Sequence, residues 1–360
     1  RTGVFPAFIR VLLTPLSWIY SFLVIVHGWL YDWCLLKQKR LPCTVFSVGN
    51  IVVGGTGKTP TVICIARYLR DAGFRVAILL RGYRRQKSPR GRGTSPSLSI
   101  AVVSDGKDIL MPVAESGDET QMIARALPDV PVLIGKDRYA SGLEAIRRWG
   151  VQGVILDDGF QHQQLAKDLE IVTVDGTHPL GTRRLLPAGT LREPPSALKR
   201  ADAILLTRMD DVKAWEDSAA EVSSTIEKYV KVEQLWESYH KPTTLYQLET
   251  GERIELSLLK GKRALAVCGI GNPEAFANTL CRCGPQHVEL LAFPDHHQYT
   301  PSDLVVIRDR ARLACADIIV TTQKDEPKIE VLQSPSLHHN SAELPIFVLA
   351  IELEITTGQE

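Results

Sequence analysis

Short apolar runs alternate with segments of helical periodicity along the first half of the chain. The runs are rich in aliphatic and β-branched residues and lie at 44–48, 76–80, 130–134, 153–156, 169–174 and 203–207. After the first run, residues 60–72 carry apolar side chains at helical spacing. Parallel strands need long crossover connections, which are usually helices. The alternation therefore predicts an α/β domain whose mainly parallel sheet is flanked by helices.

The pattern changes beyond Arg208. Residues 210–239 are charged and helix-prone, and residues 243–254 predict two short strands around a turn at Glu249-Thr250-Gly251. Apolar runs then resume at 263–268, 288–293, 318–321 and 346–351, which predicts a smaller C-terminal α/β domain. We predict four parts: an N-terminal helix at 1–36, a first α/β domain at 37–210, a connector with a two-stranded linker at 211–258, and the smaller domain at 259–360.

The N-terminal part contains a long uncharged stretch. Residues 11–31 include no Asp, Glu, Lys or Arg, and Trp18, Tyr20 and Trp29 are spaced along them. About 20 apolar residues suffice for one helix to cross the hydrocarbon core, and aromatic side chains favour the membrane interface. The stretch predicts a membrane-associated helix. A spanning helix is favoured, while an interfacial or buried helix stays open. Three basic residues that follow it, Lys37, Lys39 and Arg40, favour a cytoplasmic location for the rest of the chain.

The composition limits the classes of partner that we expect this protein to bind. The 360 residues carry a net charge of +1, so no global field would attract nucleic acid, and we expect no such partner. The seven cysteines are isolated except for Cys281 and Cys283, whose spacing fits no common zinc motif. We expect free thiols in a reducing compartment. The sequence identifies no protein partner.

A glycine-rich loop separates the first predicted strand from its helix. In a phosphate-binding loop, backbone N–H groups hold phosphate oxygens, a lysine reaches the β- and γ-phosphates, and a hydroxyl binds Mg²⁺. Lys58 and Thr59 fit the last two roles, although Val52 stands where the general pattern has its first glycine. We predict a P-loop NTPase-type fold that binds ATP with Mg²⁺ through Val52, Val53, Gly54, Gly55, Thr56, Gly57, Lys58 and Thr59.

Adjacent carboxylates follow another predicted strand. Asp157 and Asp158 end an apolar run, and Gln161 and His162 come shortly afterwards. Neighbouring carboxylates repel each other unless a cation neutralises them. Ligands also gather at the carboxyl edge of a parallel sheet. These residues predict the acidic partner that a P-loop needs for Mg²⁺.

Three further clusters remain open on their residues alone. Asp118 and Glu119 follow Gly117 and are suited either to a site or to capping a helix. Asp295, His296 and His297 could form a carboxylate–imidazole base, bind zinc, or cap a helix near Pro301. The basic residues between 81 and 92 suit a solvated loop by default, or an anionic headgroup or membrane surface.

Eight motifs in order resemble the tetraacyldisaccharide 4′-kinase family, the lipid A 4′-kinases of Gram-negative bacteria. The resemblance extends from the N-terminal apolar helix to about residue 329. The motifs are SVGNIVVGGTGKTP (47–60), RGY (81–83), GDE (117–119), DDGFQH (157–162), LLPAGTLREP (185–194), CGIGNPEAF (268–276), FPDHHQYT (293–300) and TTQKDEPK (321–328). The last departs from the family's TEKDAVKL-like pattern at Gln323 and Pro327.

The resemblance implies ATP- and Mg²⁺-dependent phosphorylation of the 4′-hydroxyl of an acylated glucosamine disaccharide 1-phosphate, on the cytoplasmic face of the inner membrane. It implies a substrate site between two domains. By the same resemblance, the catalytic residues are Asp118, His296 and Lys58, the metal neighbours are Thr59, Glu119, Asp157 and Asp158, and the substrate-facing residues are Arg81, Tyr83, Gln161, His162 and Arg192. The rival interpretation is a chaperone-type P-loop switch ATPase or GTPase, which the apolar N-terminus and the second-domain histidines disfavour.

Overall fold

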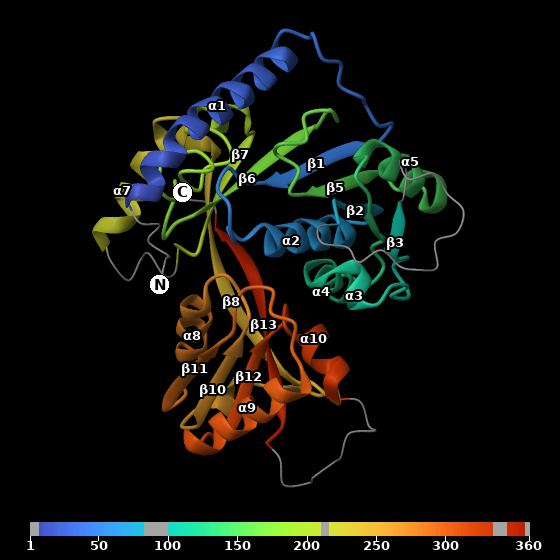
Figure 1. Cartoon of the computed structure of the whole chain (residues 1–360). Helices are drawn as coiled ribbons and strands as arrows, with labels where there is room; N and C mark the ends of the chain where they lie inside the picture. The colour runs from blue at the N-terminus through green and yellow to red at the C-terminus, as the bar shows by residue number, and fades with distance from the viewer. Residues whose placement is uncertain (1–6, 83–99, 210–215, 334–343, 357–360) are drawn as a thin grey trace.

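Two α/β lobes share one continuous sheet (Figure 1). The computed structural model describes residues 7–82, 100–209, 216–333 and 344–356. Within these residues the sheet has 13 strands, in the order β11-β10-β12-β13-β8-β7-β6-β1-β5-β2-β4-β3, with β9 paired to β8. The predicted α/β fold with a mainly parallel sheet is confirmed.

The first lobe is built on the predicted strands. They are β1 (Thr44–Gly49), β2 (Val76–Leu80), β4 (Val132–Ile134), β5 (Gly153–Asp157), β6 (Leu169–Asp175) and β7 (Ala203–Thr207), all parallel, with β3 (Ala101–Ser104) antiparallel at the edge. β1 pairs with β5 on one side and β6 on the other. The P-loop that follows β1 therefore lies at the centre of the lobe.

Helices cover both faces of this sheet because consecutive strand residues point to opposite sides. On one face, Val62 of α2 (Lys58–Asp71) and Ile123 of α4 (Asp118–Ala126) pack on Ile78 and Ile155. On the other face, Ala145 packs against the sheet. The remaining helices of the lobe are α3 (Val113–Ser116), α5 (Arg138–Trp149), α7 (Glu216–Glu227), and the 3-10 turns η1 (Pro195–Arg200) and η2 (Val232–Gln234).

The second lobe contains the later predicted strands. Its strands are β10 (Arg263–Cys268), β11 (His287–Ala292), β12 (Ile318–Thr322) and β13 (Ile346–Thr356). Its helices are α8 (Pro273–Cys281), α9 (Pro301–Leu313) and α10 (Glu326–Glu330), with 3-10 turns η3 (Leu256–Leu259) and η4 (Val331–Gln333). β10, β11 and β12 are parallel, as is β13 beside β12.

One long strand joins the lobes. β8 (Leu235–Gln247) starts parallel to β7, with Ile204 opposite Leu235, and then runs antiparallel to β13 from Glu237 to Gln247. Its end and β9 (Arg253–Ile254) form the hairpin predicted at 243–254. The helix-prone interpretation of 210–239 is wrong for residues 235–239. They belong to a strand because β7 and β13 supply the partners for their backbone hydrogen bonds. The local sequence does not predict these partners.

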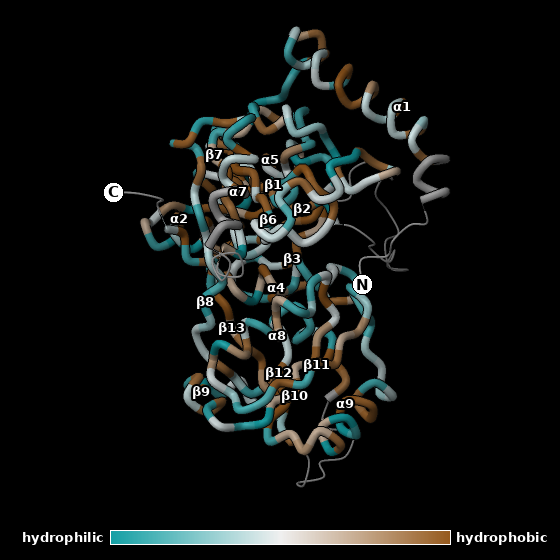
Figure 2. Tube along the Cα trace, turned by 90° about the vertical axis from the view of Figure 1, so that its left-hand side faces the viewer, coloured by the Kyte–Doolittle hydropathy of each residue, from teal (hydrophilic) through white to brown (hydrophobic). Residues whose placement is uncertain are grey.

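Helix α1 (Ala7–Asp32) lies on the outside of the first lobe (Figures 1 and 2). Its segment Leu13–Asp32 is, among the described residues, the one helix long and apolar enough to cross a membrane, and little of it is buried. In Figure 2, brown hydrophobic stretches alternate with paler ones along its length. Trp18, Phe22 and Leu23 are exposed, whereas Ser17 is buried against the lobe. One side of the helix is therefore docked on the lobe, and the rest of its surface exposes apolar side chains.

Candidate active site

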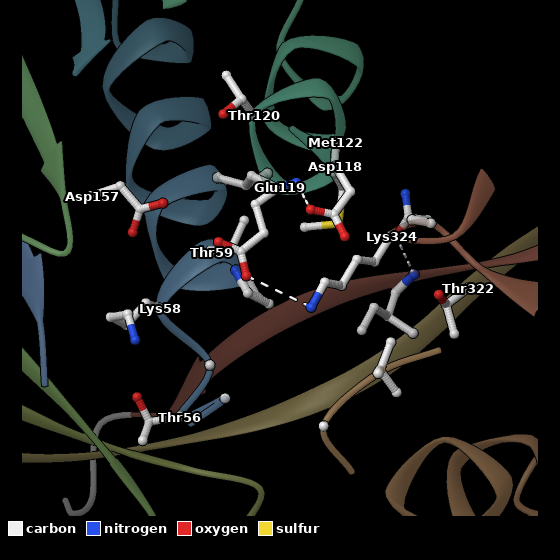
Figure 3. Close-up of a pocket in the computed structure, with 18 of the residues that line it drawn as sticks. Thr56, Lys58, Thr59, Asp118, Glu119, Thr120, Met122, Asp157, Thr322 and Lys324 are labelled. Atoms are coloured by element: carbon white, nitrogen blue, oxygen red, sulfur yellow. Dashed lines mark hydrogen bonds and ion pairs between the residues drawn. The ribbon is translucent and has the colours of Figure 1, made fainter. Parts of the chain in front are cut away.

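A cleft between the lobes contains most of the predicted site residues. Its cavity measures about 1110 Å³. The first lobe contributes the P-loop from Gly54 to Thr59 and the acidic residues Asp118, Glu119, Asp157 and Asp158, and the second contributes Asp295, His296, Lys324 and Lys328. In Figure 3, Glu119 and Lys324 point toward each other across the cleft, with Lys58 and Asp157 to one side. The cleft thus places the P-loop opposite a polar wall, which is formed by Asp295, His296, Lys324 and Lys328 of the second lobe.

The P-loop follows β1 and leads into α2, as its sequence predicts. Gly57 precedes the helix with a φ of 83°, in the left-handed region that favours glycine. A Cβ at this position would also lie 2.9 Å from Thr207 Cγ2. The buried amide of Asn50 donates to Val52 O at 2.6 Å and to Thr56 Oγ1 at 2.8 Å, so the loop is held from within.

Two residues at the carboxyl end of β7 hold the backbone of the loop. Thr207 Oγ1 donates to Thr56 O at 3.0 Å, and Arg208 donates to Gly55 O while pairing with Asp175 at 2.6 Å. Arg208 is not one of the predicted site residues. The available signal was its position at the carboxyl end of a predicted parallel strand, where ligand-binding residues of such sheets gather. The P-loop is therefore fixed by neighbouring strands as well as by its own glycines.

Asp157 is a buried carboxylate with one oxygen that lacks a hydrogen bond among the described residues. Its side chain ends β5, and among the described residues its Oδ1 atom receives no hydrogen bond. Burial, together with the negative charges of Glu119 and Asp158, raises its pKa to about 7. A buried carboxylate with an unsatisfied oxygen is unfavourable when ionised, so Asp157 is suited to bind a cation. The described residues contain no group of three or more His, Cys, Asp or Glu that could hold a metal, so a Mg²⁺ ion here would also need phosphate or water oxygens.

Asp158 behaves differently from its neighbour. Arg192 Nη1 donates to both of its oxygens, at 2.8 and 2.9 Å, and Lys58 Nζ lies 3.7 Å from Oδ1. Burial by itself raises the pKa of Asp158, but Lys58 and Arg192 outweigh this effect and lower it. Asp158 therefore stays ionised and fixes both cations at the edge of the sheet.

Gln161 and His162, predicted to face the substrate, do not line the cavity. Gln161 donates to Asn50 O at 2.9 Å and to Glu193 Oε1 at 3.1 Å. Burial, with help from Arg138, lowers the pKa of His162 to about 4, so this imidazole is neutral near pH 7. Gln161 thus links the loop that carries Arg192 to the residues before the P-loop.

The predicted carboxylate–imidazole pair forms across the cleft. Asp118, at the start of α4, lies with its Oδ2 3.1 Å from His296 Nδ1, although the two residues are 178 positions apart. Burial would raise the pKa of Asp118, but Lys328, Lys324 and His296 lower it. His297 faces another way: its Nε2 lies 3.2 Å from Asp303 Oδ2, in the cap of α9. The neighbouring histidines therefore have separate partners.

Two lysines of the TTQKDEPK motif complete the wall. Lys324 Nζ lies 3.1 Å from Asp295 and 3.7 Å from Glu119. The buried Lys328 Nζ lies 3.3 Å from Asp118 and 2.9 Å from Asp325. The motif is part of the resemblance, but neither lysine is among the predicted site residues. Gln323, where the motif departs from the pattern, accepts a hydrogen bond from Ile351 N at 3.1 Å. Both lysines line the cleft.

Arg81 and Tyr83, which follow β2 in the chain, are both predicted to face the substrate. Arg81 follows β2, is exposed and lines the cleft. Tyr83 lies outside the described residues, as do the predicted basic positions from 84 to 92.

The chain is similar to known proteins over nearly its whole length. The family model described as tetraacyldisaccharide-1-P 4′-kinase (LpxK) matches residues 9–360. The tetraacyldisaccharide 4′-kinase of Syntrophus aciditrophicus is 42% identical over 96% of this chain and 89% of its own length. The corresponding protein of Halothermothrix orenii is 39% identical over 96% and 88%. The crystal structure of "apo" form LpxK from Aquifex aeolicus in complex with ATP has a TM-score of 0.73 at 31% identity, covering 97% of this chain and 95% of that one.

Proposed function

This chain belongs to the tetraacyldisaccharide-1-P 4′-kinase family, and from that premise we propose that its cleft transfers the γ-phosphoryl group of ATP to the 4′-hydroxyl of a tetraacyldisaccharide 1-phosphate. The observation that carries the proposal is the position of the Asp118–His296 pair, which lines the same cavity as Lys58 and the P-loop. An acceptor hydroxyl held at this pair lies on the side of the cleft that faces the bound phosphates.

The first lobe binds the donor. The backbone of Gly54–Thr59 surrounds the phosphates at the start of α2, where N–H groups and the helix dipole favour negative charge. Lys58 and Arg192 stabilise the charge that develops on the γ-phosphoryl group. Thr59 and Asp157, with Glu119 and Asp158 nearby, would hold the Mg²⁺ ion. When bound, that ion neutralises phosphate oxygens.

The second lobe completes the acceptor site. The 4′-hydroxyl gives its proton to the Asp118–His296 pair while its oxygen bonds to the γ-phosphorus. The bond from that phosphorus to the β–γ bridging oxygen breaks, and ADP leaves with the electron pair. Because Asp118 and His296 come from different lobes, closure assembles the pair and excludes water, which limits wasteful hydrolysis.

We further propose that the site works at a membrane surface. The acceptor carries acyl chains, and α1 exposes Trp18, Phe22 and Leu23 to solvent. We assign the chain to the inner membrane with both lobes on the cytoplasmic face, where ATP is present. The exposed apolar side chains of α1 and the basic residues Lys37, Lys39 and Arg40 support this assignment.

The proposed base pair is tested by phosphotransfer from γ-labelled ATP to tetraacyldisaccharide 1-phosphate. We expect Asp118→Asn and His296→Asn each to lower kcat by about 10²- to 10⁴-fold, since each removes half of the pair that takes the proton. His297→Asn is the matched control, because its imidazole pairs with Asp303 instead. Its kcat should stay close to wild type. Wild-type rates in the first two variants would show that another group accepts the proton.

A further inference from the structure

Helix α1 is attached to the first lobe by polar side chains one helical turn apart. Ser17 Oγ donates to Leu185 O at 3.1 Å and accepts from Ala188 N at 3.0 Å. Tyr20 OH donates to Arg192 O at 2.8 Å. Positions 17 and 20 lie on the same face of a helix. All three bonds go to the backbone of a single loop, the Leu185–Arg192 loop.

The same loop is bonded to the residues just before the P-loop. Arg192 N donates to Ile51 O at 2.7 Å, and Val53 N donates to Thr190 O at 2.8 Å. The Arg192 side chain then reaches Asp158, which lies beside Lys58. A continuous series of contacts thus runs from α1 through the loop backbone to the phosphate-binding side of the cleft.

We propose that Ser17 and Tyr20 are positioning residues for phosphoryl transfer, which fix the Leu185–Arg192 loop against α1 and so hold the Arg192 guanidinium beside Asp158. The inference rests on the proposed function, because it requires that Arg192 acts on the transferred group. It assigns α1 a role beyond attachment to lipid. Two hydroxyl groups thereby couple the position of Arg192 in the active site to the contact between the apolar side of α1 and the membrane.

The geometry of the loop places Arg192 at the bond from Tyr20. Its chain reverses within the segment Leu185–Leu191, which is closed by bonds from Leu186 N to Leu191 O and from Leu191 N to Arg184 O. Arg192 lies at the end of this segment, where the Tyr20 bond is made. A small displacement of a charge-stabilising group lowers a rate strongly, since transfer depends on position to within about 1 Å.

The test compares hydroxyl deletions on α1. Tyr20→Phe and Ser17→Ala each remove the hydroxyl with little change of shape. We expect each to lower kcat for lipid phosphorylation by about five- to tenfold, the loss set by a lost hydrogen bond and a less ordered Arg192. Tyr31→Phe is the matched control on the same helix, because the recorded side-chain contact of Tyr31 is a ring contact with His27, which phenylalanine keeps. Its kcat should not change.

Two further measurements separate positioning from anchoring and from folding. Co-sedimentation with vesicles of phosphatidylethanolamine and phosphatidylglycerol should be unchanged in Tyr20→Phe, and its unfolding temperature should shift by no more than about 4 °C. In the Arg192→Ala background, Tyr20→Phe should cause no additional loss of kcat, because both changes act on the same group.

Several results would overturn the inference. Wild-type kcat in both hydroxyl variants, full additivity with Arg192→Ala, or a loss of kcat that follows a loss of vesicle binding would each do so, the last reducing α1 to an anchor. Failure of the proposed function is distinct, because the wild-type enzyme would then not transfer label to the disaccharide at all.

Discussion

Neighbouring carboxylates at the end of β5 have opposite electrostatic environments. Burial raises the pKa of Asp157, while Lys58 and Arg192 outweigh burial at Asp158 and lower its pKa. Adjacent acids whose pKa values are pushed apart can take separate roles. We therefore assign Asp158 to holding the two cations in place and Asp157 to the ion that accompanies ATP.

The pKa of about 7 at Asp157 predicts that Mg²⁺ binding is coupled to proton release. A metal binds the ionised carboxylate, so its affinity falls as the pH drops below 7 and protons compete for the site. Calorimetry of Mg²⁺ binding to the ATP complex, in buffers of different ionisation enthalpy, should show release of up to about one proton per ion near pH 7. Asp157→Asn should abolish the difference between buffers. A difference retained in that variant would assign the proton to another group.

Lys328 predicts a second pH effect. This buried ammonium lies between Asp118 and Asp325 and is one of the groups that lower the pKa of Asp118. In Lys328→Met the pKa of Asp118 should rise, so the acid limb of the kcat/KM profile should move to higher pH. Lys328→Arg keeps the charge and should restore the limb most of the way. Identical acid limbs in wild type and Lys328→Met would exclude this influence on the reaction.

Elements differ in how much of their conformation comes from their own residues. The P-loop has a strict local requirement, since Gly57 takes a positive φ and also lies against Thr207. Gly55 meets no atom within 4 Å of an added Cβ. Two glycines of one motif therefore serve different needs.

Gly57→Ala should lower the free energy of unfolding by about 1–3 kcal/mol through backbone strain and the contact with Thr207. Gly55→Ala should cost distinctly less, because it meets no steric obstacle. Chemical denaturation of both variants without nucleotide measures the difference. Equal losses would mean that the φ of Gly57 and its contact with Thr207 contribute nothing measurable.

The docked side of α1 bears on whether this helix spans the membrane. Ser17 and Tyr20 lie within Leu13–Asp32, and both are bonded to loop backbone. Irregular backbone exposed to lipid does not occur in the hydrocarbon core. We therefore expect α1 to lie along the interface, with its docked side on the Leu185–Arg192 loop and its exposed apolar side chains in lipid.

Spin labels at positions 18 and 29, in a cysteine-free background, test this orientation by their depth in vesicles. The two positions lie on nearly the same side of the helix, about 16 Å apart along its axis. An interfacial helix places them at similar depths. A depth difference close to the full separation would show that α1 spans.

At the scale of the whole molecule, the lobes are held together by a strand ribbon and by ionic contacts. The β8–β13 pair runs between the lobes, and Arg125 of α4 pairs with Glu326 and Glu330 of α10 at 3.3 and 2.6 Å. Arg125 does not line the cavity. This contact therefore reports on how the lobes are held, without belonging to the site itself.

Arg125→Met should favour the open arrangement and lower kcat/KM for the lipid by about two- to fivefold, in line with the modest energy of a partly exposed ion pair. Small-angle scattering should show a larger radius of gyration without nucleotide. Arg147→Met is the control, because its pair with Glu144 lies within a single helix. Equal effects of the two substitutions would remove any special role for the contact between lobes.

Much of this molecule could be predicted from sequence because its elements depend on local patterns. Apolar runs between helical segments identified most strands, and glycines followed by Lys58 and Thr59 identified the phosphate loop. The first residues of β8 were assigned wrongly, since their charged sequence resembles a helix and their strand state depends on β7 and β13. β3 was not predicted, since its short run pairs only at the edge of the sheet.

Sequence by itself determined the chemical groups available to this protein and the backbone state of the segments that carry them. Only the tertiary structure decided which groups meet. It pairs His296 with Asp118 and His297 with Asp303, brings Lys328 to Asp118, and links Tyr20 to the loop of Arg192. The reason is physical: periodicity and glycine placement follow from interactions within a few residues. Contacts between distant residues depend on how the two lobes and α1 pack together. The spacing of residues along the chain does not predict this packing.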